Sequence, residues 1–178
     1  MKIGIDISQL AYTNTGVANY LQTLIKRLLN FDTKNEYILF FSSMRRDFSI
    51  QSLKTQVANK NISIRYFKFP PTFLDFVWNK LHILSIESLI GDVDIFITSD
   101  WTEPPTRKAK KATILYDLIV YKYPDETHKK IVDTQKRKLE WVKKESDVIF
   151  CISESTKRDA MKILEIDEKR LKVAYPGF

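Results

Sequence analysis

Acidic side chains flank an aromatic ring in a loop that follows a predicted strand. Asp100 and Glu103 lie on either side of Trp101 in the sequence. This arrangement suits carbohydrate, because the C–H faces of a sugar pack on an aromatic ring while its hydroxyl groups need acceptors. The alternative is a tryptophan that only packs within its own loop. The residue types are compatible with both interpretations.

A second loop with an acidic residue begins at the end of the next strand, where Tyr116 precedes Asp117. The Asp117 carboxylate can accept a proton or orient a sugar hydroxyl group. It can equally accept hydrogen bonds from amides of its own loop, as aspartates in turns commonly do. Its position in the sequence does not separate these two roles.

The segment from Asn14 to Gly16 joins the first predicted strand to the first predicted helix. The N-terminus of a helix presents unpaired N–H groups and a partial positive charge, so it attracts phosphate. Gly16, beside Thr15, allows a ligand to approach the backbone closely. The G-x-G-x-x-G fingerprint of dinucleotide sites is absent. We therefore expect Gly16 either to lie near a phosphate or merely to permit the turn.

Ser153 follows a β-branched and apolar run, Val148 to Ile152, and stands where a helix N-cap belongs. It lacks the G-x-S-x-G pattern of a nucleophilic serine, so we expect a cap that also leaves room for a ligand contact. Cys151, the single cysteine, is expected to be a buried strand thiol. The two histidines lack metal-ligand spacing, and no metal site is expected.

Alternating strands and helices must position these loops. Hydrophobic periodicity predicts strands at 2–7, 36–41, 62–67, 94–98, 112–116, 148–152 and 171–175. It predicts helices at 17–28, 72–90, 126–145 and 153–164, with a partly helical polar segment at 45–60. This order indicates a Rossmann-like, doubly wound α/β sheet, mostly parallel, in a single domain over 1–178. In such sheets ligands bind at the carboxyl ends of strands, where the loops described above lie.

The composition excludes several classes of protein. The chain has 178 residues, of which 44% are apolar, so it is long and apolar enough for one globular domain and is not disordered. One cysteine excludes an intramolecular disulfide framework. The N-terminus does not resemble a signal peptide, and no stretch approaches the ~20 apolar residues of a membrane span. The expected compartment is the cytoplasm.

The formal charge of +7 comes from 29 basic and 22 acidic side chains. The densest basic run, Arg107 to Lys111, is expected to be a solvated loop. The basic helix from Lys129 to Lys144 interleaves acidic residues, so we expect a solvated face and not a nucleic-acid stripe. No zinc finger, RNA-recognition or helix-turn-helix pattern accompanies it, and no nucleic-acid partner is expected.

Several segments, taken in order, resemble the N-terminal domain of family 4 (group 1) nucleotide-sugar glycosyltransferases with the two-domain GT-B architecture. The chain is most similar to bacterial mannosyl- or rhamnosyltransferase-like members, and the resemblance covers nearly all of it. The segments are Ile3-Gly4-Ile5-Asp6, Gly16-Val17-Ala18-Asn19-Tyr20, Asp94-Ile95-Phe96 with Pro104-Pro105, Tyr116-Asp117-Leu118 with Pro124, Ser153-Glu154-Ser155-Thr156-Lys157-Arg158-Asp159, and Val173-Ala174-Tyr175-Pro176-Gly177.

The resemblance implies a hexosyltransferase that moves a sugar from a nucleotide-sugar co-substrate to a glycan or lipid-linked acceptor, with no metal or other cofactor. Gly16, with Thr15, would lie near the donor phosphates. Asp117 matches the acid of the family's His-Asp pair near the reacting sugar, and Ser153 matches the serine that opens the following helix. The candidate acceptor-binding residues are Asp100, Trp101, Glu103 and Ser153, and the candidate catalytic residues are Asp117 and Tyr116.

Two departures from the family pattern affect these expectations. Tyr116 stands where the family has histidine, and Ile97-Thr98 replaces a common His-Ser pair. A tyrosine with a pKa of ~10 is a poor proton acceptor at neutral pH, although its hydroxyl group can still bind a phosphate or sugar.

The chain also stops where the family crosses into its C-terminal, donor-binding domain. We expect this chain alone not to transfer sugar, and to need that domain or a partner chain. The alternative is a non-catalytic acceptor-binding and membrane-docking subunit of a bipartite glycosyltransferase. Its basic residues would then make peripheral contact with the inner face of the membrane.

Overall fold

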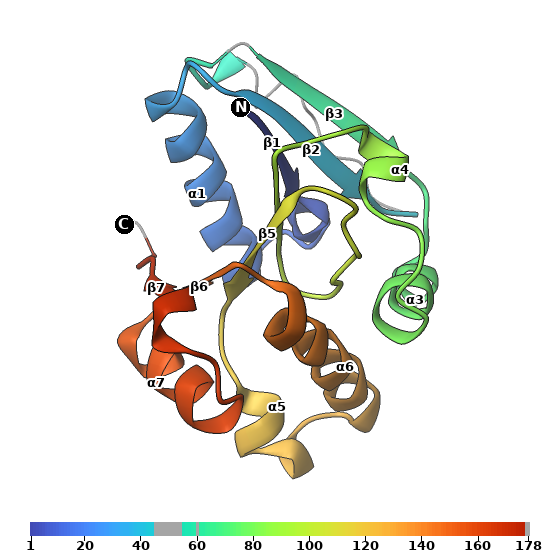
Figure 1. Cartoon of the computed structure of the whole chain (residues 1–178), viewed down its shortest axis with the longest axis vertical. Helices are drawn as coiled ribbons and strands as arrows, with labels where there is room; N and C mark the ends of the chain where they lie inside the picture. The colour runs from blue at the N-terminus through green and yellow to red at the C-terminus, as the bar shows by residue number, and fades with distance from the viewer. Residues whose placement is uncertain (45–54, 60, 177–178) are drawn as a thin grey trace.

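A single seven-stranded, all-parallel sheet forms the centre of the computed structural model, which describes residues 1–44, 55–59 and 61–176 (Figure 1). The strands are β1 (Lys2–Asp6), β2 (Glu36–Ser42), β3 (Ile62–Phe67), β4 (Ile95–Thr98), β5 (Lys110–Leu115), β6 (Val148–Cys151) and β7 (Leu171–Val173). Their order in the sheet is β3-β2-β1-β4-β5-β6-β7. This order and the flanking helices confirm the predicted Rossmann-like α/β fold.

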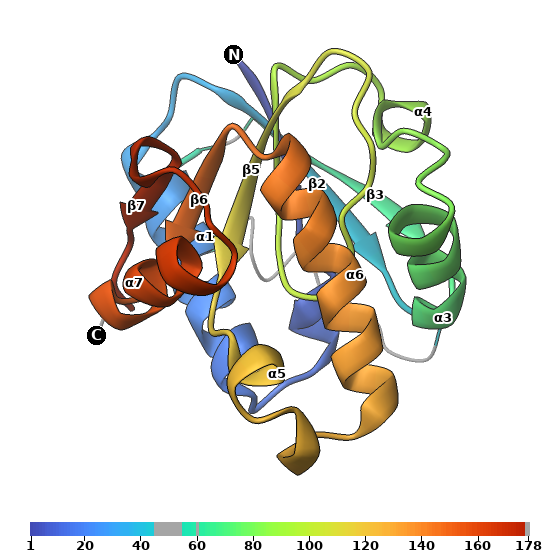
Figure 2. The ribbon, with the colours of Figure 1, turned by 60° about the horizontal axis from the view of Figure 1, so that its bottom comes forward.

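The helices lie on both faces of the sheet (Figures 1 and 2). They are α1 (Gly16–Phe31), α3 (Pro71–Leu74), the π-helix η2 (Asp75–Lys80), α4 (Glu87–Ile90), α5 (Ile119–Lys122), α6 (Lys129–Glu145) and α7 (Glu154–Ile163). Short 3-10 turns are η1 (Ser8–Ala11), η3 (Pro124–Glu126) and η4 (Glu168–Arg170). No helix in the described ranges is long and apolar enough to span a bilayer.

Each face of the sheet has its own buried core. On one face, Leu21 and Ile25 of α1 pack against apolar side chains of β1 and β2, as the predicted stripe of that helix requires. On the other face, Phe40 and Phe96 pack with the fully buried Trp78 of η2. Helices α6 and α7 share a third core with β5, β6 and β7. These cores hold the strand ends, and therefore the loops that follow them, in place.

The predicted continuous helix over 72–90 is wrong. The chain makes only α3 and the π-helix η2, then turns at His82 (φ 52°) and Leu84 (φ 62°) before α4. Burial of Trp78 explains the break, because its indole Nε1 donates to the Leu84 carbonyl (2.9 Å) and draws the chain back over the ring. Gly91 is the C-cap of α4, with φ of 85°. The predicted partly helical segment at 45–60 lies mostly outside the described residues.

The sheet order contains one topological switch point, between β1 and β4. From β1 the chain proceeds to β2 and β3 in one direction, and from β4 it proceeds to β5, β6 and β7 in the other. At a switch point, the loops that follow two neighbouring strands turn to opposite sides of the sheet. A crevice forms between them at the carboxyl ends of the strands, and doubly wound folds bind ligands there. The loops after β1, β4 and β5 meet at this edge.

Candidate functional site

A cavity of about 240 Å³ lies at the carboxyl ends of β4 and β5, and we call it the carboxyl-edge cavity. Its walls come from the start of α1, from the loops after β4 and β5, and from α6. The residues that matter for its chemistry are Val17, Asp100, Trp101, Tyr116, Asp117 and Gln135. Segments separated by about 100 residues in the sequence therefore meet in one place, as the fold rule predicted.

Buried side chains hold the backbone of the loop after β4. Three successive carbonyl groups each accept a hydrogen bond: Ser99 from Lys138 Nζ (2.7 Å), Asp100 from Gln135 Nε2 (3.2 Å) and Trp101 from Asn79 Nδ2 (2.9 Å). Gln135 Nε2 also lies 3.3 Å from the Asp100 carboxylate. A loop held at three successive carbonyl groups presents its side chains with little entropy left to lose on binding.

Tyr116 is buried at the base of the cavity. Its hydroxyl group lies 3.2 Å from Ser99 Oγ, and its ring meets Tyr20 edge-on with centroids 5.5 Å apart. Burial raises the pKa of Tyr116 above its usual range, so the phenol stays protonated near neutral pH. Tyr116 can therefore donate or accept a hydrogen bond, but it cannot replace the proton-accepting histidine of the resembled family.

Asp117 is exposed at the rim of the cavity. Its Oδ1 accepts a hydrogen bond from the Ile119 amide (3.0 Å), so the structural role considered from the sequence is present. A carboxylate has about four acceptor positions, and its Oδ2 is available for a hydroxyl group of a ligand. The two roles considered for Asp117 are thus compatible.

The N-terminus of α1 begins at a capped and open turn. Thr15 Oγ1 accepts a hydrogen bond from the Ala18 amide (3.2 Å), which makes Thr15 the N-cap. The left-handed residue of the turn is Asn14 (φ 69°) and not Gly16, so the backbone angle does not require glycine. A Cβ at Gly16 would meet no atom within 4 Å. The space beside Gly16 is therefore open to a ligand, and the turn itself does not explain the glycine.

Ser153 is the N-cap of α7, as predicted. Its Oγ accepts a hydrogen bond from the Thr156 amide (3.1 Å), and Thr156 Oγ1 in turn donates to the Tyr116 carbonyl (3.1 Å). Ser153 does not line the carboxyl-edge cavity, so its link to the site runs through Thr156 and Tyr116. Cys151 is buried, which confirms that prediction.

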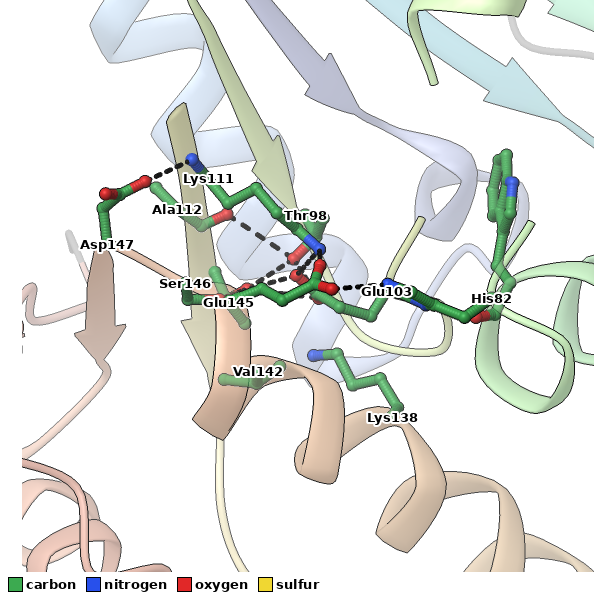
Figure 3. Close-up of polar contacts among 12 residues, drawn as sticks. His82, Thr98, Glu103, Lys111, Ala112, Lys138, Val142, Glu145, Ser146 and Asp147 are labelled. Carbon is green, nitrogen blue, oxygen red and sulfur yellow. Dashed lines mark hydrogen bonds and ion pairs between the residues drawn. The ribbon is translucent and has the colours of Figure 1, made fainter. Parts of the chain in front are cut away.

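Glu103 requires a correction, because it does not line the cavity and its carboxylate lies in a buried polar cluster between the sheet and α6 (Figure 3). Thr98 Oγ1 donates to its carboxylate (2.7 Å), and Lys111 Nζ lies 3.3 Å from it. Its side chain has no exposed surface. Glu103 therefore cannot flank Trp101 as a sugar acceptor, and Asp100 alone remains on that side of the cavity.

The expectation of a solvated Arg107–Lys111 run is wrong for its last residue. Lys111 lies in β5 with 2% of its side chain exposed, and its Nζ donates to Glu145 (2.7 Å) as well as pairing with Glu103. Glu145 also lies 2.8 Å from His82 Nε2, whose ring stacks on Trp141. We call Glu103, Lys111 and Glu145 the ionic cluster; these three residues are brought together from the loop after β4, from β5 and from α6 (Figure 3).

Lys138 is a second buried lysine and corrects the expectation of a fully solvated basic face on α6. Burial lowers its pKa, against the opposing charges of Glu103, Asp100 and Asp6. Burial likewise raises the pKa of Asp100 and of Asp6 at the end of β1, although Lys138 counteracts both shifts. For Lys138, Asp100 and Asp6, burial therefore makes the charged form less favourable than it would be in water.

Three functional candidates were missed at the level of sequence. Asp6 ends β1, one residue before the end of the predicted strand at 2–7, and an acidic residue at that place could have been noticed. Gln135 and Lys138 gave no signal, because a glutamine in a weak helical stripe and one lysine among several look like surface residues. Only the packing of α6 against the loop after β4 shows that both face inward.

Comparisons with known proteins leave the family open. No protein-family model matches this chain, and no curated protein matches it either. Among the described residues, no group of three or more His, Cys, Asp or Glu side chains is arranged to hold a metal ion. The geometry of the carboxyl-edge cavity is therefore the basis for any functional conclusion.

Proposed function

We propose that this chain is the acceptor-binding domain of a GT-B nucleotide-sugar glycosyltransferase, and that the carboxyl-edge cavity holds the acceptor sugar. One observation carries the proposal. Side chains from two separate loops, which the sequence analysis named as candidates, line one cavity beside the switch point: Asp100, Trp101, Tyr116 and Asp117. Ligands of doubly wound sheets bind at such a place.

The cavity offers a stacking surface and several hydrogen-bond acceptors. The half-buried Trp101 ring can pack on the C–H face of a sugar, while Asp100 and Asp117 accept hydrogen bonds from its hydroxyl groups. These carboxyl groups favour a neutral, hydroxylated group over an anion. In this proposal Asp117 orients the acceptor hydroxyl group or takes its proton, and the open N-terminus of α1 at Gly16 faces the donor phosphates.

A second candidate function is a non-catalytic acceptor-binding subunit of a bipartite glycosyltransferase. The burial of Tyr116 favours it, because the position of the family's histidine then holds no proton acceptor near neutral pH. Both candidates use the same cavity and differ in whether transfer takes place there. Peripheral membrane contact would belong to either one.

Sugar binding tests the shared part of both candidates. Saturation-transfer NMR with the methyl glycosides of mannose, rhamnose, glucose and N-acetylglucosamine should give signal with at least one of them. Trp101→Ala should weaken that binding about tenfold or more, because stacking and the apolar contact are lost together. Phe31→Ala is the matched control, since Phe31 is 88% exposed at the other end of α1. Absence of binding to the whole panel would contradict the proposal.

Sugar transfer separates the two candidates. With labelled UDP- and GDP-sugars and the bound glycoside as acceptor, we expect no product from this chain alone. Addition of a donor-binding domain or partner chain should yield product under both candidates, but Asp117→Asn should lower the rate at saturating acceptor only under the first. Product that forms equally well with Asp117→Asn would contradict the role proposed for Asp117. Product from this chain alone would contradict the need for a second domain or chain.

A further inference from the structure

A second cavity of about 250 Å³ lies on the other side of Trp101, and we call it the flanking cavity. Trp101 and Ile131 line both cavities, so they form a common wall. The remaining walls of the flanking cavity come from Tyr12, which follows η1, from α3, η2 and α6, and from Thr102 in the loop after β4. We propose that it binds the second sugar unit of an oligosaccharide acceptor whose terminal unit occupies the carboxyl-edge cavity. This inference rests on the proposed function and extends it to the size of the substrate.

The volumes of the two cavities support a ligand that spans both. A typical small-molecule site encloses ~300–1,000 Å³. The carboxyl-edge cavity of about 240 Å³ and the flanking cavity of about 250 Å³ each fall below that range. Taken together they fall within it. A ligand that crosses the Trp101 wall would therefore fill a site of ordinary size, whereas a single sugar would leave half of it empty.

The flanking cavity has the side chains that a sugar ring needs. Tyr12 and Trp101 supply aromatic surface, and Asp75 supplies a carboxylate. Thr72, Thr102, Lys130 and Thr134 also line this cavity, whose surface is mainly apolar. Two aromatic side chains beside a carboxylate repeat the arrangement of aromatic and carboxylate side chains in the carboxyl-edge cavity. The proposed occupant is therefore a second sugar ring.

Asp75 is held in one orientation but keeps acceptor capacity. Arg137 donates to its Oδ2 (2.8 Å) and Asn79 Nδ2 to its Oδ1 (2.9 Å), while 21% of its side chain stays exposed. Thr134 Oγ1 also donates to Oδ2 (3.5 Å), so a carboxylate with about four acceptor positions can still receive one hydroxyl group of a ligand. Its position is thus fixed before a ligand arrives, as effective binding sites require.

The buried Asn79 connects the two cavities. Its Nδ2 donates both to Asp75 Oδ1 and to the Trp101 carbonyl, each at 2.9 Å, and its Oδ1 accepts from the Glu103 amide. Asp75 and Asn79 both lie in the π-helix η2, an element that is rare and occurs frequently at functional sites. The carboxylate of one cavity and the shared wall are therefore positioned by a single side chain.

The experiment compares sugars of one and two units with the 178-residue chain. Titrations would use the methyl glycoside that gives signal in the panel above, the methyl glycosides of its α- and β-linked disaccharides, and its octyl glycoside. We expect at least one disaccharide to bind about tenfold or more tightly than the monosaccharide. Tyr12→Ala should reduce the disaccharide affinity to that of the monosaccharide, since only the second unit contacts Tyr12. Asp75→Asn, which keeps the shape of the side chain, should remove part of the gain.

Each outcome of these titrations has a definite meaning. Equal affinity for one and two units, or a gain that Tyr12→Ala leaves intact, would overturn the flanking site while the proposed function stands. A gain with the octyl glycoside but with neither disaccharide would overturn it in favour of an apolar occupant. Failure of every sugar to bind would overturn both proposals. Tyr12 is 41% exposed, so its replacement should not unfold the chain, and Phe31→Ala again serves as the matched control.

Discussion

The carboxyl-edge cavity and the ionic cluster lie on either side of one short loop and use the same residue types differently. In the ionic cluster, Glu103 receives hydrogen bonds from threonine hydroxyl groups and an ion pair from Lys111. At the cavity, Asp100 receives a hydrogen bond only from Gln135 among the contacts described, and burial raises its pKa. The charged groups of the ionic cluster find nearly all of their hydrogen-bond partners within the protein, whereas the cavity keeps acceptor atoms that a ligand can use.

This difference separates a structural polar site from a candidate binding site. Buried charges that are fully paired stabilise one arrangement of the loop, and breaking the pair leaves an uncompensated charge. Charges left partly unpaired cost stability and are retained where a ligand completes them. We infer that the ionic cluster anchors the loop after β4, and that this loop in turn holds Asp100 and Trp101 at the cavity.

The largest expected effect comes from removing Lys111. Lys111→Ala leaves Glu103 buried without its ion pair, so the free energy of unfolding should fall by about 3–5 kcal/mol. Urea denaturation would measure the change. Lys110→Ala alters the exposed neighbour on the same strand and should change the free energy by less than about 0.5 kcal/mol. Equal effects of the two substitutions would show that the cluster does not stabilise the loop.

Removing Lys138 should affect the loop and the carboxylate at the carboxyl-edge cavity. Lys138→Met leaves the Ser99 carbonyl without its donor, at a cost of about 2 kcal/mol. It also removes a charge that lowers the pKa of Asp100, so that pKa should rise further. A raised pKa favours the protonated form of the folded protein. The variant should therefore lose additional stability as pH rises from the ordinary aspartate value of 3.8 through the raised value.

Carboxyl ¹³C NMR together with urea denaturation at several pH values would detect these changes. Lys129→Met, an exposed lysine at the start of the same helix, is the control. An unchanged Asp100 titration in Lys138→Met would contradict the coupling between the two groups.

Glu145 should show the opposite dependence on pH. Burial by itself raises the pKa of Glu145, but the hydrogen bond and charge of Lys111 outweigh it, so the net pKa is lowered. A lowered pKa stabilises the folded state above the ordinary value of 4.5, and this contribution is lost as pH falls through the folded pKa. Glu145→Gln should therefore cost about 1 kcal/mol at pH 7, and the difference from the unaltered chain should shrink below pH ~4.5. A difference that is independent of pH would argue against the ion pair.

An effect no larger than that of Glu145→Gln is expected from Tyr116→Phe. Loss of the hydroxyl group leaves Ser99 Oγ without this partner and should lower the free energy of unfolding by about 1 kcal/mol. Because Tyr116 is buried at the base of the cavity, the affinity for the methyl glycoside should change little. Calorimetric titration measures that affinity, and thermal denaturation measures the stability. A large loss of affinity with unchanged stability would place the hydroxyl group in direct contact with the sugar.

Local features of the chain could be predicted because they depend on neighbouring residues. The stripe on α1 and the N-cap Ser153 follow from side chains within a few positions. The alternation of these elements indicated a doubly wound sheet, and the sheet rule then placed Asp100, Trp101 and Asp117 at one edge.

The partners of buried polar groups depend on contacts between distant segments, so only the tertiary structure decided them. Glu103 looks like a second acceptor beside Trp101 in the sequence, yet Lys111 and the β4–β5 threonines draw it inward. Likewise, the periodicity of 72–90 predicted one helix, but burial of Trp78 broke it into a π-helix that carries Asn79. The sequence determined the elements and their order, because these follow from local periodicity. Which charges were buried and which were left for a ligand depended on packing across the sheet.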